Sequence, residues 1–312
     1  KLLGGEGLYY VYRTDDDLFI LPLIKRKVPS KFSKNEYYDL TSPYGYAGYY
    51  SSRPLSFQQL DVIIKKFGTL CKQNSYISAF VRLHPIFNNV TLGNSGFYQH
   101  IIHGETVLID LKRETELIRN DYSQNHKRDI RKLIKQGFKV VHNDWNRYKE
   151  FQELYTETMS YLNASSFYFF DESYFEALRK IYPNNLELVL VCNAEGRAVS
   201  GGLFFSYNKI AQYHLGGTLL DFRRVAPSKL MFDFMVDIFK ENESLVYFHL
   251  GGGLGSADDE LLRFKKGFSK NTVYFSTLRL ITDRDKYLSF TAANQNEKMS
   301  AIDENYFPKY RA

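Results

Sequence analysis

Apolar positions in the second half of the chain follow two kinds of period, with polar turns between them. Short β-rich apolar runs predict strands at 138–143, 186–193, 198–207, 210–218, 245–250 and 272–281. A helical period predicts helices at 145–162, 171–182 and 227–240, the last of them apolar over most of its circumference. Antiparallel strands followed by a strand–helix–strand crossover predict a mixed sheet with helices on both faces.

The first half repeats part of this order. Strands are predicted at 8–13, 18–27, 37–41 and 76–84, and a helix capped by Ser56 is predicted at 56–72. The order hairpin, strand, helix, strand therefore occurs in both halves, although the halves share no visible sequence similarity. This repeat predicts two related lobes, joined by a linker or surface loop at 85–97.

Composition and charge limit the class of protein. A chain of 312 residues with 44% hydrophobic content suits one large or two mid-sized folded domains and excludes disorder. The net charge of +6 favours anionic partners but is too small to identify nucleic-acid binding. Cys71 and Cys192 stand in apolar settings and are predicted to be buried free thiols. No apolar run approaches the ~20 residues that span a bilayer, so we expect a cytoplasmic protein without a transmembrane segment.

A glycine-rich segment, Gly251–Gly255, interrupts an apolar run. It lacks the spacing of a nucleotide-binding loop, and Ser256 stands where the last glycine of G-x-G-x-x-G belongs. Ser256 is instead predicted to cap the next helix, with Asp258, Asp259 and Glu260 in the first turn. Because carboxylates at a helix N-terminus repel phosphate, a nucleotide loop is excluded.

The helix after these glycines carries a lysine within its apolar face. At ~100° per residue, Leu261, Leu262, Phe264 and Phe268 form one apolar arc, and Lys265 falls inside it. A lysine inside a buried stripe is unusual. Two interpretations stay open: the ammonium reaches solvent along the packed stem, or it points into a cleft and pairs with phosphate or developing negative charge.

A second candidate region runs from the strand at 210–218 into the N-terminus of the following helix. Arg223, Arg224 and Lys229 bracket this terminus, and Pro227 occupies its first turn. A helix N-terminus offers unpaired N–H groups and a positive dipole end to an anion. An arginine pair before a helix is also common in solvated turns, so both interpretations stay open.

Three weaker signals lie elsewhere. The helix at 122–138 has a basic outer side that includes Arg128 and Arg131, which is either a solvated face or a phosphate contact. The segments 39–50 and 161–170 are rich in aromatic and small residues and resemble ligand-facing loops. The histidines show no metal-ligand spacing with cysteines or acids, so no metal site is predicted.

The residues described so far resemble a known family. The order of elements from 138 to 281 resembles the GNAT acyltransferase fold. The segments HLGGGLGSADDELLRFKKGF at 249–268 and SQNHKRDIRKLIKQGF at 123–138 are similar to the FemAB-like branch, which includes aminoacyltransferases that extend peptidoglycan cross-bridges. The sharpest mark is L-x-x-F-K-x-x-F at 261–268.

The resemblance implies a fold and a domain organisation. The expected class is α+β (mixed α/β), with two GNAT-like lobes, each a mixed, mostly antiparallel sheet flanked by helices. We expect a partial GNAT-like lobe at 1–105, the acyltransferase lobe at 106–290 and a polar tail at 291–312 that packs back on the first lobe. The resemblance also implies a bacterial protein.

The resemblance implies a donor site and a reaction centre. GNAT proteins bind the donor pyrophosphate through an R/Q-x-x-G-x-G/A turn, whereas the matching stretch here has Ala226 and Ser228 in place of glycines. This departure disfavours standard acetyl-CoA binding and fits the Fem-type branch better. In Fem-type transferases the lysine of an F-K pair serves the reaction centre, which carries over to Phe264 and Lys265. The helical hairpin that some of them use for tRNA contact is absent, so tRNA as a partner stays open.

We therefore predict an N-acyltransferase that moves an acyl or aminoacyl group from acyl-CoA or aminoacyl-tRNA to an amine of a cell-wall precursor or amino sugar. The alternatives are a non-catalytic module that binds a saccharide or a partner, and a nucleic-acid-binding protein. The donor is a co-substrate, and no tightly bound cofactor is expected. The predicted catalytic residues are Lys265, Phe264, Tyr213, His214 and Asp221.

The binding residues complete the prediction. The predicted donor-binding residues are Leu215, Gly216, Gly217, Arg223, Arg224, Ala226, Pro227, Ser228 and Lys229. The predicted acceptor-binding residues are Tyr44, Gly45, Tyr46, Ser166, Tyr168, Arg128 and Arg131. Backbone N–H groups at Leu215–Gly217 are the expected oxyanion donors. The proton acceptor stays open among Asp221, Tyr213 and His214.

Overall fold

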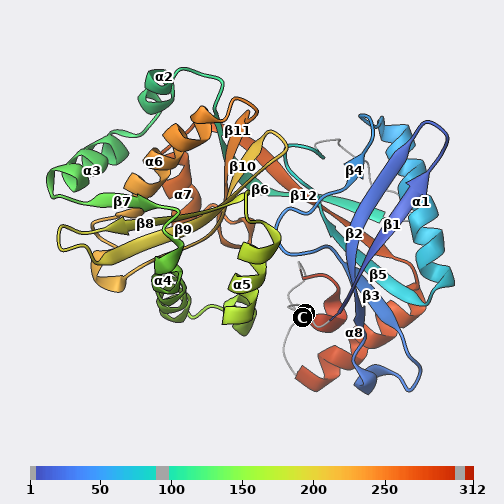
Figure 1. Ribbon diagram of the computed structural model, residues 1–312. Helices are drawn as coiled ribbons and strands as arrows, with labels where there is room; N and C mark the ends of the chain where they lie inside the picture. Colours follow the sequence, from blue (N-terminus) through green and yellow to red (C-terminus); the bar gives the residue numbers. More distant parts are fainter. Residues whose placement is uncertain (1–4, 89–97, 299–305) are drawn as a thin grey trace. The chain divides into compact units, whose positions relative to one another are not determined.

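The structure is a computed structural model that describes residues 5–88, 98–298 and 306–312 of the chain (Figure 1). The chain forms two compact units, unit 1 (residues 1–103 and 274–312) and unit 2 (residues 104–273). The boundaries fall within two strands, β6 (Tyr98–Asp110) and β12 (Asn271–Ile281). The predicted second boundary lies at residue 290, whereas in the structure most of β12 and the segment after it belong to unit 1.

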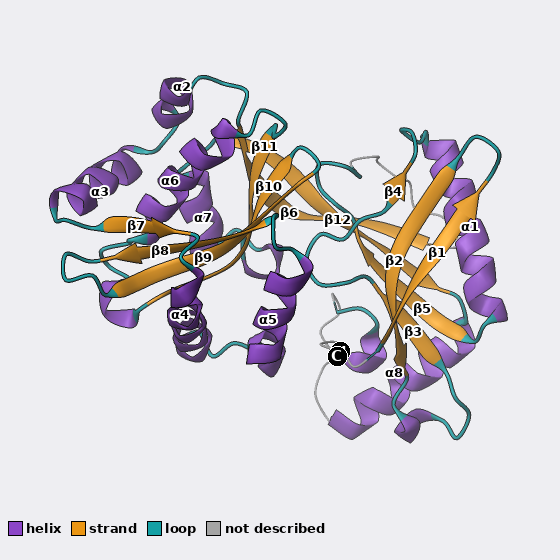
Figure 2. Cartoon of the chain, in the orientation of Figure 1, coloured by secondary structure: helices purple, strands orange, loops and turns teal. Residues whose placement is uncertain are grey.

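Unit 2 is built on a mixed sheet (Figure 2). Its strands follow the order β6, β11, β10, β9, β8, β7, and each neighbouring pair is antiparallel except β10 and β11. Those two are parallel because the helix α6 connects them by a crossover. The strand bounds are β7 Lys139–His142, β8 Leu186–Cys192, β9 Ala198–Tyr207, β10 Ile210–Thr218 and β11 Tyr247–Gly252.

Helices cover both faces of this sheet, as Figure 2 shows. Along β8, Val189 and Val191 point to one face and Leu188 and Leu190 to the other, as the strand period of two requires. The first face packs against α3, α6 and α7, and we call it the α6–α7 face; the second packs against α4 and α5 and is the α4–α5 face. The helix bounds are α2 Thr115–Asn120, α3 Gln124–Lys135, α4 Tyr148–Tyr161, α5 Glu172–Ile181, α6 Ser228–Glu241 and α7 Glu260–Lys266.

Unit 1 has a smaller sheet with the strand order β1, β2, β3, β5, β12. The helix α1 packs on one face of this sheet, and α8 packs with the C-terminal residues on a second cluster that includes Ile77 and Tyr310. A capping box at Ser56 fixes the start of α1, as predicted. The bounds are β1 Glu6–Arg13, β2 Leu18–Lys27, β3 Tyr38–Thr41, β4 Tyr50–Ser51, β5 Tyr76–Arg82, α1 Phe57–Gln73 and α8 Arg284–Lys298.

The two units share one order of connections. The path β1-β2-β3-α1-β5 in unit 1 corresponds to β8-β9-β10-α6-β11 in unit 2, and in each the crossover helix joins a parallel strand pair. In each sheet the last strand of this path has an antiparallel strand on its other side: β12 beside β5, and β6 beside β11. This arrangement confirms the predicted fold class, two lobes that each hold a mixed, mostly antiparallel sheet flanked by helices.

Two details next to the glycine-rich segment differ from the prediction. β11 continues through Gly252 rather than ending at residue 250. The cap of α7 is Asp259, not Ser256, because the Asp259 carboxylate accepts from the backbone N–H of Leu262 at 2.8 Å and from that of Leu254 at 2.8 Å. The helix therefore begins later than expected, and the carboxylate also ties it to the preceding turn.

Two elements whose buried positions are partly polar, α8 and β6, were not predicted from the sequence. α8 buries Tyr287, Phe290, Thr291 and Asn294 at helical spacing, so polar side chains occupy half of this stripe. β6 was not predicted because its histidines and acids interrupt the apolar run. Of the expected linker at 85–97, residues 89–97 lie outside the described residues.

Candidate active site

The parallel strands β10 and β11 separate partway along their length. Their pairing runs from Ile210 to Gln212 on β10 and ends opposite His249 on β11. Beyond this point β10 continues beside β9 as far as Thr218, and β11 continues beside β6 as far as Gly252. Both strands have an irregular register just after the last shared pair. We call residues 213–218 of β10 and 250–252 of β11 the strand fork.

A backbone amide of β10 faces the fork. Leu219 N donates to Val199 O of β9 at 2.9 Å. Because amides alternate in direction along a strand, those of Gly217 and Leu215 also face β9, whereas that of Gly216 faces away from it. Among the amides expected to bind an oxyanion, Gly216 N–H is therefore the one directed to the fork.

The irregularity in β10 sends two neighbouring side chains to opposite faces. Residue 214 is the extra residue between the pairs at 213 and 215. The Tyr213 ring packs on the α6–α7 face, 4.9 Å from the ring centre of Phe232. His214 lies on the α4–α5 face, where its Nε2 is 2.8 Å from the Tyr174 hydroxyl, and burial lowers the pKa of His214 to about 4. Of these two predicted residues, only Tyr213 lies on the face that carries Lys265.

Lys265 is buried at the fork, with 5% of its surface exposed. Its Nζ donates to the backbone carbonyl of Gly252 at 2.7 Å and lies 5.8 Å from the centre of the Tyr213 ring. Burial lowers the pKa of Lys265 to about 8, and the Asp259 carboxylate acts in the opposite direction. The ammonium thus does not reach solvent along its stem.

Gly216 lies directly beside the Tyr213 hydroxyl. A Cβ at position 216 would overlap this hydroxyl, so a side chain there would displace it. The fork therefore brings together a tyrosine hydroxyl, the backbone of Gly216 and the amine of Lys265. The expected apolar arc on α7 is wrong at Leu261, which is 42% exposed, and right at Leu262, which is buried.

The loop between β10 and α6 holds Asp221, a predicted catalytic residue, and four of the nine predicted donor-binding residues, Arg223, Arg224, Ala226 and Pro227. Asp221, Arg223 and Arg224 are exposed, and the Arg223 guanidinium lies 4.3 Å from the centre of the Tyr161 ring. Asp221 lies in a short 3-10 turn, Leu220–Phe222. The arginine pair thus occupies a solvated turn, the alternative considered from the sequence.

The N-terminus of α6 is largely committed to internal contacts. Lys229 N donates to Ala226 O at 3.1 Å, and Leu230 N donates to Pro227 O at 3.0 Å. The Lys229 side chain is 4% exposed, and its Nζ forms an ion pair with the Asp129 carboxylate at 2.6 Å. Because these two amides and the lysine already have partners, this terminus differs from an open pyrophosphate cradle.

Ala226 adopts the left-handed backbone conformation, with φ at 55°. Glycine favours this conformation, whereas a Cβ makes it unfavourable by about 1–2 kcal/mol. We expect Ala226→Gly to stabilise unit 2 by up to ~1 kcal/mol, since glycine's larger unfolded-state entropy offsets part of the relief. Urea denaturation measures this change; Ala211→Gly, in a buried strand of the same unit, is the control and should destabilise. A loss of stability in Ala226→Gly would contradict the expectation.

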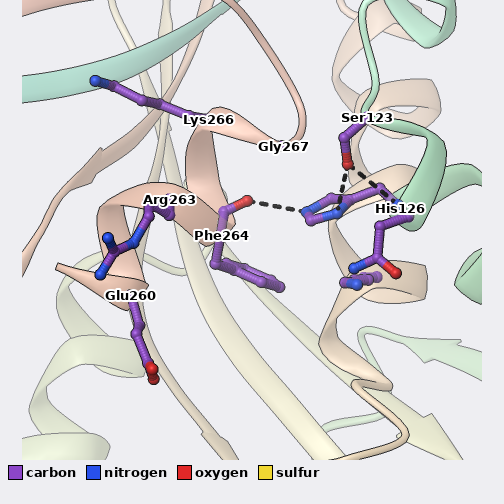
Figure 3. Close-up of a pocket in the computed structure, with 9 residues that line it drawn as sticks. Ser123, His126, Glu260, Arg263, Phe264, Lys266 and Gly267 are labelled. Atoms are coloured by element: carbon purple, nitrogen blue, oxygen red, sulfur yellow. Dashed lines mark hydrogen bonds between the residues drawn. The ribbon is translucent and has the colours of Figure 1, made fainter.

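A cleft of about 480 Å³ adjoins α7 on the side of α3 (Figure 3). Phe264, a predicted catalytic residue, lines this cleft together with His126 and Gly267. Lys266 also lines the cleft, and its ammonium pairs with the Glu105 carboxylate at 2.5 Å. The remaining lining residues are Ser123, Asn125, Lys229, Glu260 and Arg263.

The predicted acceptor-binding residues belong to both units. In unit 1, Tyr44 is exposed, Gly45 has φ at 89°, and the Tyr46 ring packs edge-on against Phe275 at 5.1 Å. In unit 2, Ser166 and Tyr168 form a 3-10 turn whose carbonyl at 168 accepts from the Tyr155 hydroxyl at 2.8 Å.

Arg128 and Arg131 lie on the outer side of α3. Arg131 Nε donates to Lys127 O at 3.1 Å, and Arg128 contacts Asn125 and Asp129. The acceptor site stays a prediction for Arg128 and Arg131, for Ser166 and Tyr168, and for the residues in unit 1.

Two further sequence predictions concern thiols and metals. Cys71 and Cys192 are free and buried, and burial raises the pKa of Cys71 to about 12. Over residues 5–88, 98–298 and 306–312, no three His, Cys, Asp or Glu side chains are arranged to hold a metal ion. Within the same described ranges, no helix has both the length and the apolar character needed to cross a membrane.

Comparison with known proteins agrees with the predicted resemblance. The model of the FemAB family matches residues 93–195, from before β6 to the turn after β8. Among solved structures, FemX superposes with a TM-score of 0.68 at 15% identity, over 92% of this chain and 90% of that chain. A comparison with curated proteins finds no match.

Two further structures share the fold. The C-terminal domain of a protein named as a lysylphosphatidylglycerol synthetase from Agrobacterium fabrum has a TM-score of 0.56 at 11% identity, over 94% of this chain and 89% of that chain. L-PGS from Bacillus licheniformis has a TM-score of 0.55 at 12% identity, over 90% of this chain and 89% of that chain. The resemblance to the FemAB-like branch is thus confirmed by the family model over residues 93–195, and the fold by FemX over most of the chain.

Proposed function

We propose that this chain is an N-acyltransferase that moves an acyl or aminoacyl group from acyl-CoA or aminoacyl-tRNA to an amine of a cell-wall precursor or amino sugar. The observation that carries the proposal is the buried amine of Lys265 at the strand fork. The FemAB family match and the FemX fold support an acyltransferase. Both donors are intracellular, so the proposal places the reaction in the cytoplasm.

The fork supplies groups that such a transfer needs. The acceptor amine attacks the donor carbonyl carbon, a C–N bond forms, and the C–S bond of a thioester or the C–O bond of a tRNA ester breaks. The negative charge that develops on the carbonyl oxygen is stabilised by Gly216 N–H and by protonated Lys265. The proton lost by the amine passes to the leaving sulfur or oxygen.

Among the predicted proton acceptors, Tyr213 has the position that suits the role. Its hydroxyl lies beside Gly216, on the same face as Lys265. His214 lies on the opposite face and contacts Tyr174, and Asp221 is exposed in the loop after β10. We therefore assign the proton relay to the Tyr213 hydroxyl.

Mass spectrometry of the acceptor after incubation with each donor tests the proposal. We expect the acceptor amine to gain the mass of the acyl or aminoacyl group. Lys265→Ala is expected to lower turnover by about 10²–10³-fold, the loss typical of a missing oxyanion donor, and Lys265→Arg is expected to lower it less. Wild-type turnover in both variants would remove the role of Lys265.

Donor binding is measured separately by thermal shift. A bound donor at 100 times its Kd should stabilise the chain by about 2.7 kcal/mol. A chain that binds saccharides but gains no stability from either donor, and forms no product, would be a binding module instead. Binding to arbitrary RNA or DNA with steep salt dependence would favour the nucleic-acid alternative.

A further inference from the structure

His126 is a buried histidine that the sequence analysis did not assign to the site. It lies one helical turn before Ile130 and two before Leu133, so its spacing with these buried residues was the signal available in the sequence. Its ring packs 4.4 Å from the ring centre of Phe268 and 5.4 Å from that of Phe264. His126 therefore joins α3 to the helix that carries Lys265.

Two hydrogen bonds fix the protonation state of this ring, as Figure 3 shows. His126 Nε2 lies 2.9 Å from Phe264 O, and a carbonyl only accepts, so Nε2 carries the proton. Nδ1 then accepts from the Ser123 hydroxyl at 3.1 Å. Burial lowers the pKa of His126 to about 4, and Lys229 of α6 acts in the same direction, while Asp129 of α3 opposes them. The ring is neutral at pH 7 and holds one tautomer.

The hydrogen bond from His126 reaches the peptide group that bears Lys265. Phe264 O belongs to the peptide bond between residues 264 and 265, in the last turn of a seven-residue helix. So short a helix is unstable by itself, and contacts from outside stabilise it. Phe264 O accepts from Gly267 N at 3.1 Å, and His126 adds a second donor to the same carbonyl. Ser123 N donates to Gly267 O at 2.8 Å, so the same segment of α3 holds the end of α7 at two carbonyls.

The glycine at 267 makes this contact possible. A Cβ at that position would overlap the His126 ring at Cε1 and Nε2. Lys265 is the next residue of the same short helix, and its Nζ donates to Gly252 O, so the rotation of α7 about its axis decides where the amine lies. A displacement of a catalytic group by about 1 Å can lower a reaction rate by roughly 10²-fold.

We propose that His126 is a positioning residue that holds α7 in the orientation that keeps the Lys265 amine at the strand fork. The effect of His126 on turnover rests on the proposed function. Its effect on the position of the Lys265 amine can be measured without any reaction. Ser123 orients the ring, and Gly267 leaves the space it occupies.

The test compares His126→Leu, which keeps apolar volume but removes the donor, with His126→Gln, whose amide N–H can still reach Phe264 O. NMR of ¹⁵N-lysine, with the Lys265 signal assigned by its absence in Lys265→Arg, measures the pKa of Lys265. In His126→Leu we expect this pKa to rise from about 8 toward 10.5 as the amine gains access to water. We expect kcat to fall by about 10- to 100-fold with little change in KM, and His126→Gln to restore both in part.

His142→Leu is the matched control. This histidine of the same unit also donates through Nε2, to the Glu187 carboxylate at 2.9 Å, but lies on β7. We expect wild-type values of the Lys265 pKa and of kcat in this variant. An equal loss in His142→Leu would show general loosening of unit 2 and overturn the proposal.

A second variant decides the question if His126→Leu does not fold. Gly267→Ala adds a Cβ that displaces the His126 ring from Phe264 O, and the Lys265 pKa should rise in it as well. A wild-type Lys265 pKa in either folded variant overturns the positioning role. If the wild-type chain transfers no group at all, the proposed function fails, while the pKa comparison still decides whether His126 holds the amine.

Discussion

Replacing Lys265 with methionine is expected to stabilise unit 2 at pH 7 while it removes most of the proposed transfer activity. In the folded chain burial lowers the pKa of Lys265 from 10.5 to about 8. This difference corresponds to about 3 kcal/mol that burying the ammonium costs at neutral pH. Loss of the donor to Gly252 O offsets about 1–2 kcal/mol. The net gain in the free energy of unfolding is therefore expected to be about 1–2 kcal/mol.

The gain should depend on pH with a defined sign. Below pH 8 the lysine is charged in both the folded and the unfolded chain, so the full cost of burial is present. Between about pH 8 and 10.5 the folded chain holds the neutral amine, whereas the unfolded chain still binds the proton. The wild-type chain therefore gains stability as the pH rises through this range, and the advantage of Lys265→Met shrinks.

Urea denaturation of both chains at pH 7 and at pH 9.5 measures this difference. Lys266→Met is the matched control, because the neighbouring lysine on the same helix is partly exposed and paired with Glu105. Its loss should destabilise the chain by less than ~1 kcal/mol, with no gain at either pH. If Lys265→Met is less stable than wild type at pH 7, with the same deficit at pH 9.5, the amine is not a buried charge.

A stabilising substitution at a buried lysine also has a functional meaning. Mutations of a buried, hydrogen-bonded group usually destabilise a protein. A residue whose removal stabilises the fold is retained for its chemistry rather than for its packing. The stability measurement thus supports a reaction role for Lys265 without a known donor or acceptor.

The position of Lys265 could be predicted because a helix imposes a regular period. The arc of apolar residues placed this lysine inward, and its burial agrees. The same argument failed at Leu261, which is 42% exposed although it lies inside the helix. The start of the helix was also misplaced, since it begins at Glu260 and not just after Ser256. Both Ser256 and Asp259 are residue types that cap helices. Which of them reaches a free amide depends on the turn at Leu254, which the local sequence does not reveal.

The faces of β10 show a different limit. A strict period of two places Tyr213 and Leu215 on one face of the sheet. The extra residue in β10 breaks this period, so the two side chains pack in different clusters. Nothing in the sequence marks this bulge, which explains why Tyr213 and His214 were predicted as candidates for one site. Likewise, the role of His126 depends on a carbonyl 138 residues away in the chain.

Unit 1 is expected to lose much of its stability when Asp39 is replaced by asparagine. The Asp39 carboxylate is fully buried and accepts from Arg26 at 2.7 Å and from Arg311 at 2.5 Å. The Tyr310 hydroxyl donates to it at 3.2 Å. Asparagine keeps the volume but leaves two guanidinium groups without their anion. Removing one partner of a buried ion pair costs about 3–5 kcal/mol, and we expect a loss near ~3 kcal/mol because both arginines are partly exposed.

The same substitution should release the C-terminal residues from unit 1. Tyr310 and Arg311 lie in a turn that depends on Asp39 and on Ser78, whose hydroxyl is 2.8 Å from that of Tyr310. Urea denaturation gives the loss of stability, and hydrogen exchange of the peptide covering residues 306–312 reports the release. Asp17→Asn is the control, since the Asp17–Arg53 pair is exposed and should contribute less than ~1 kcal/mol. If both variants lose the same small amount of stability, and hydrogen exchange of the 306–312 peptide is unchanged, the packing of α8 holds the C-terminus and the buried carboxylate does not.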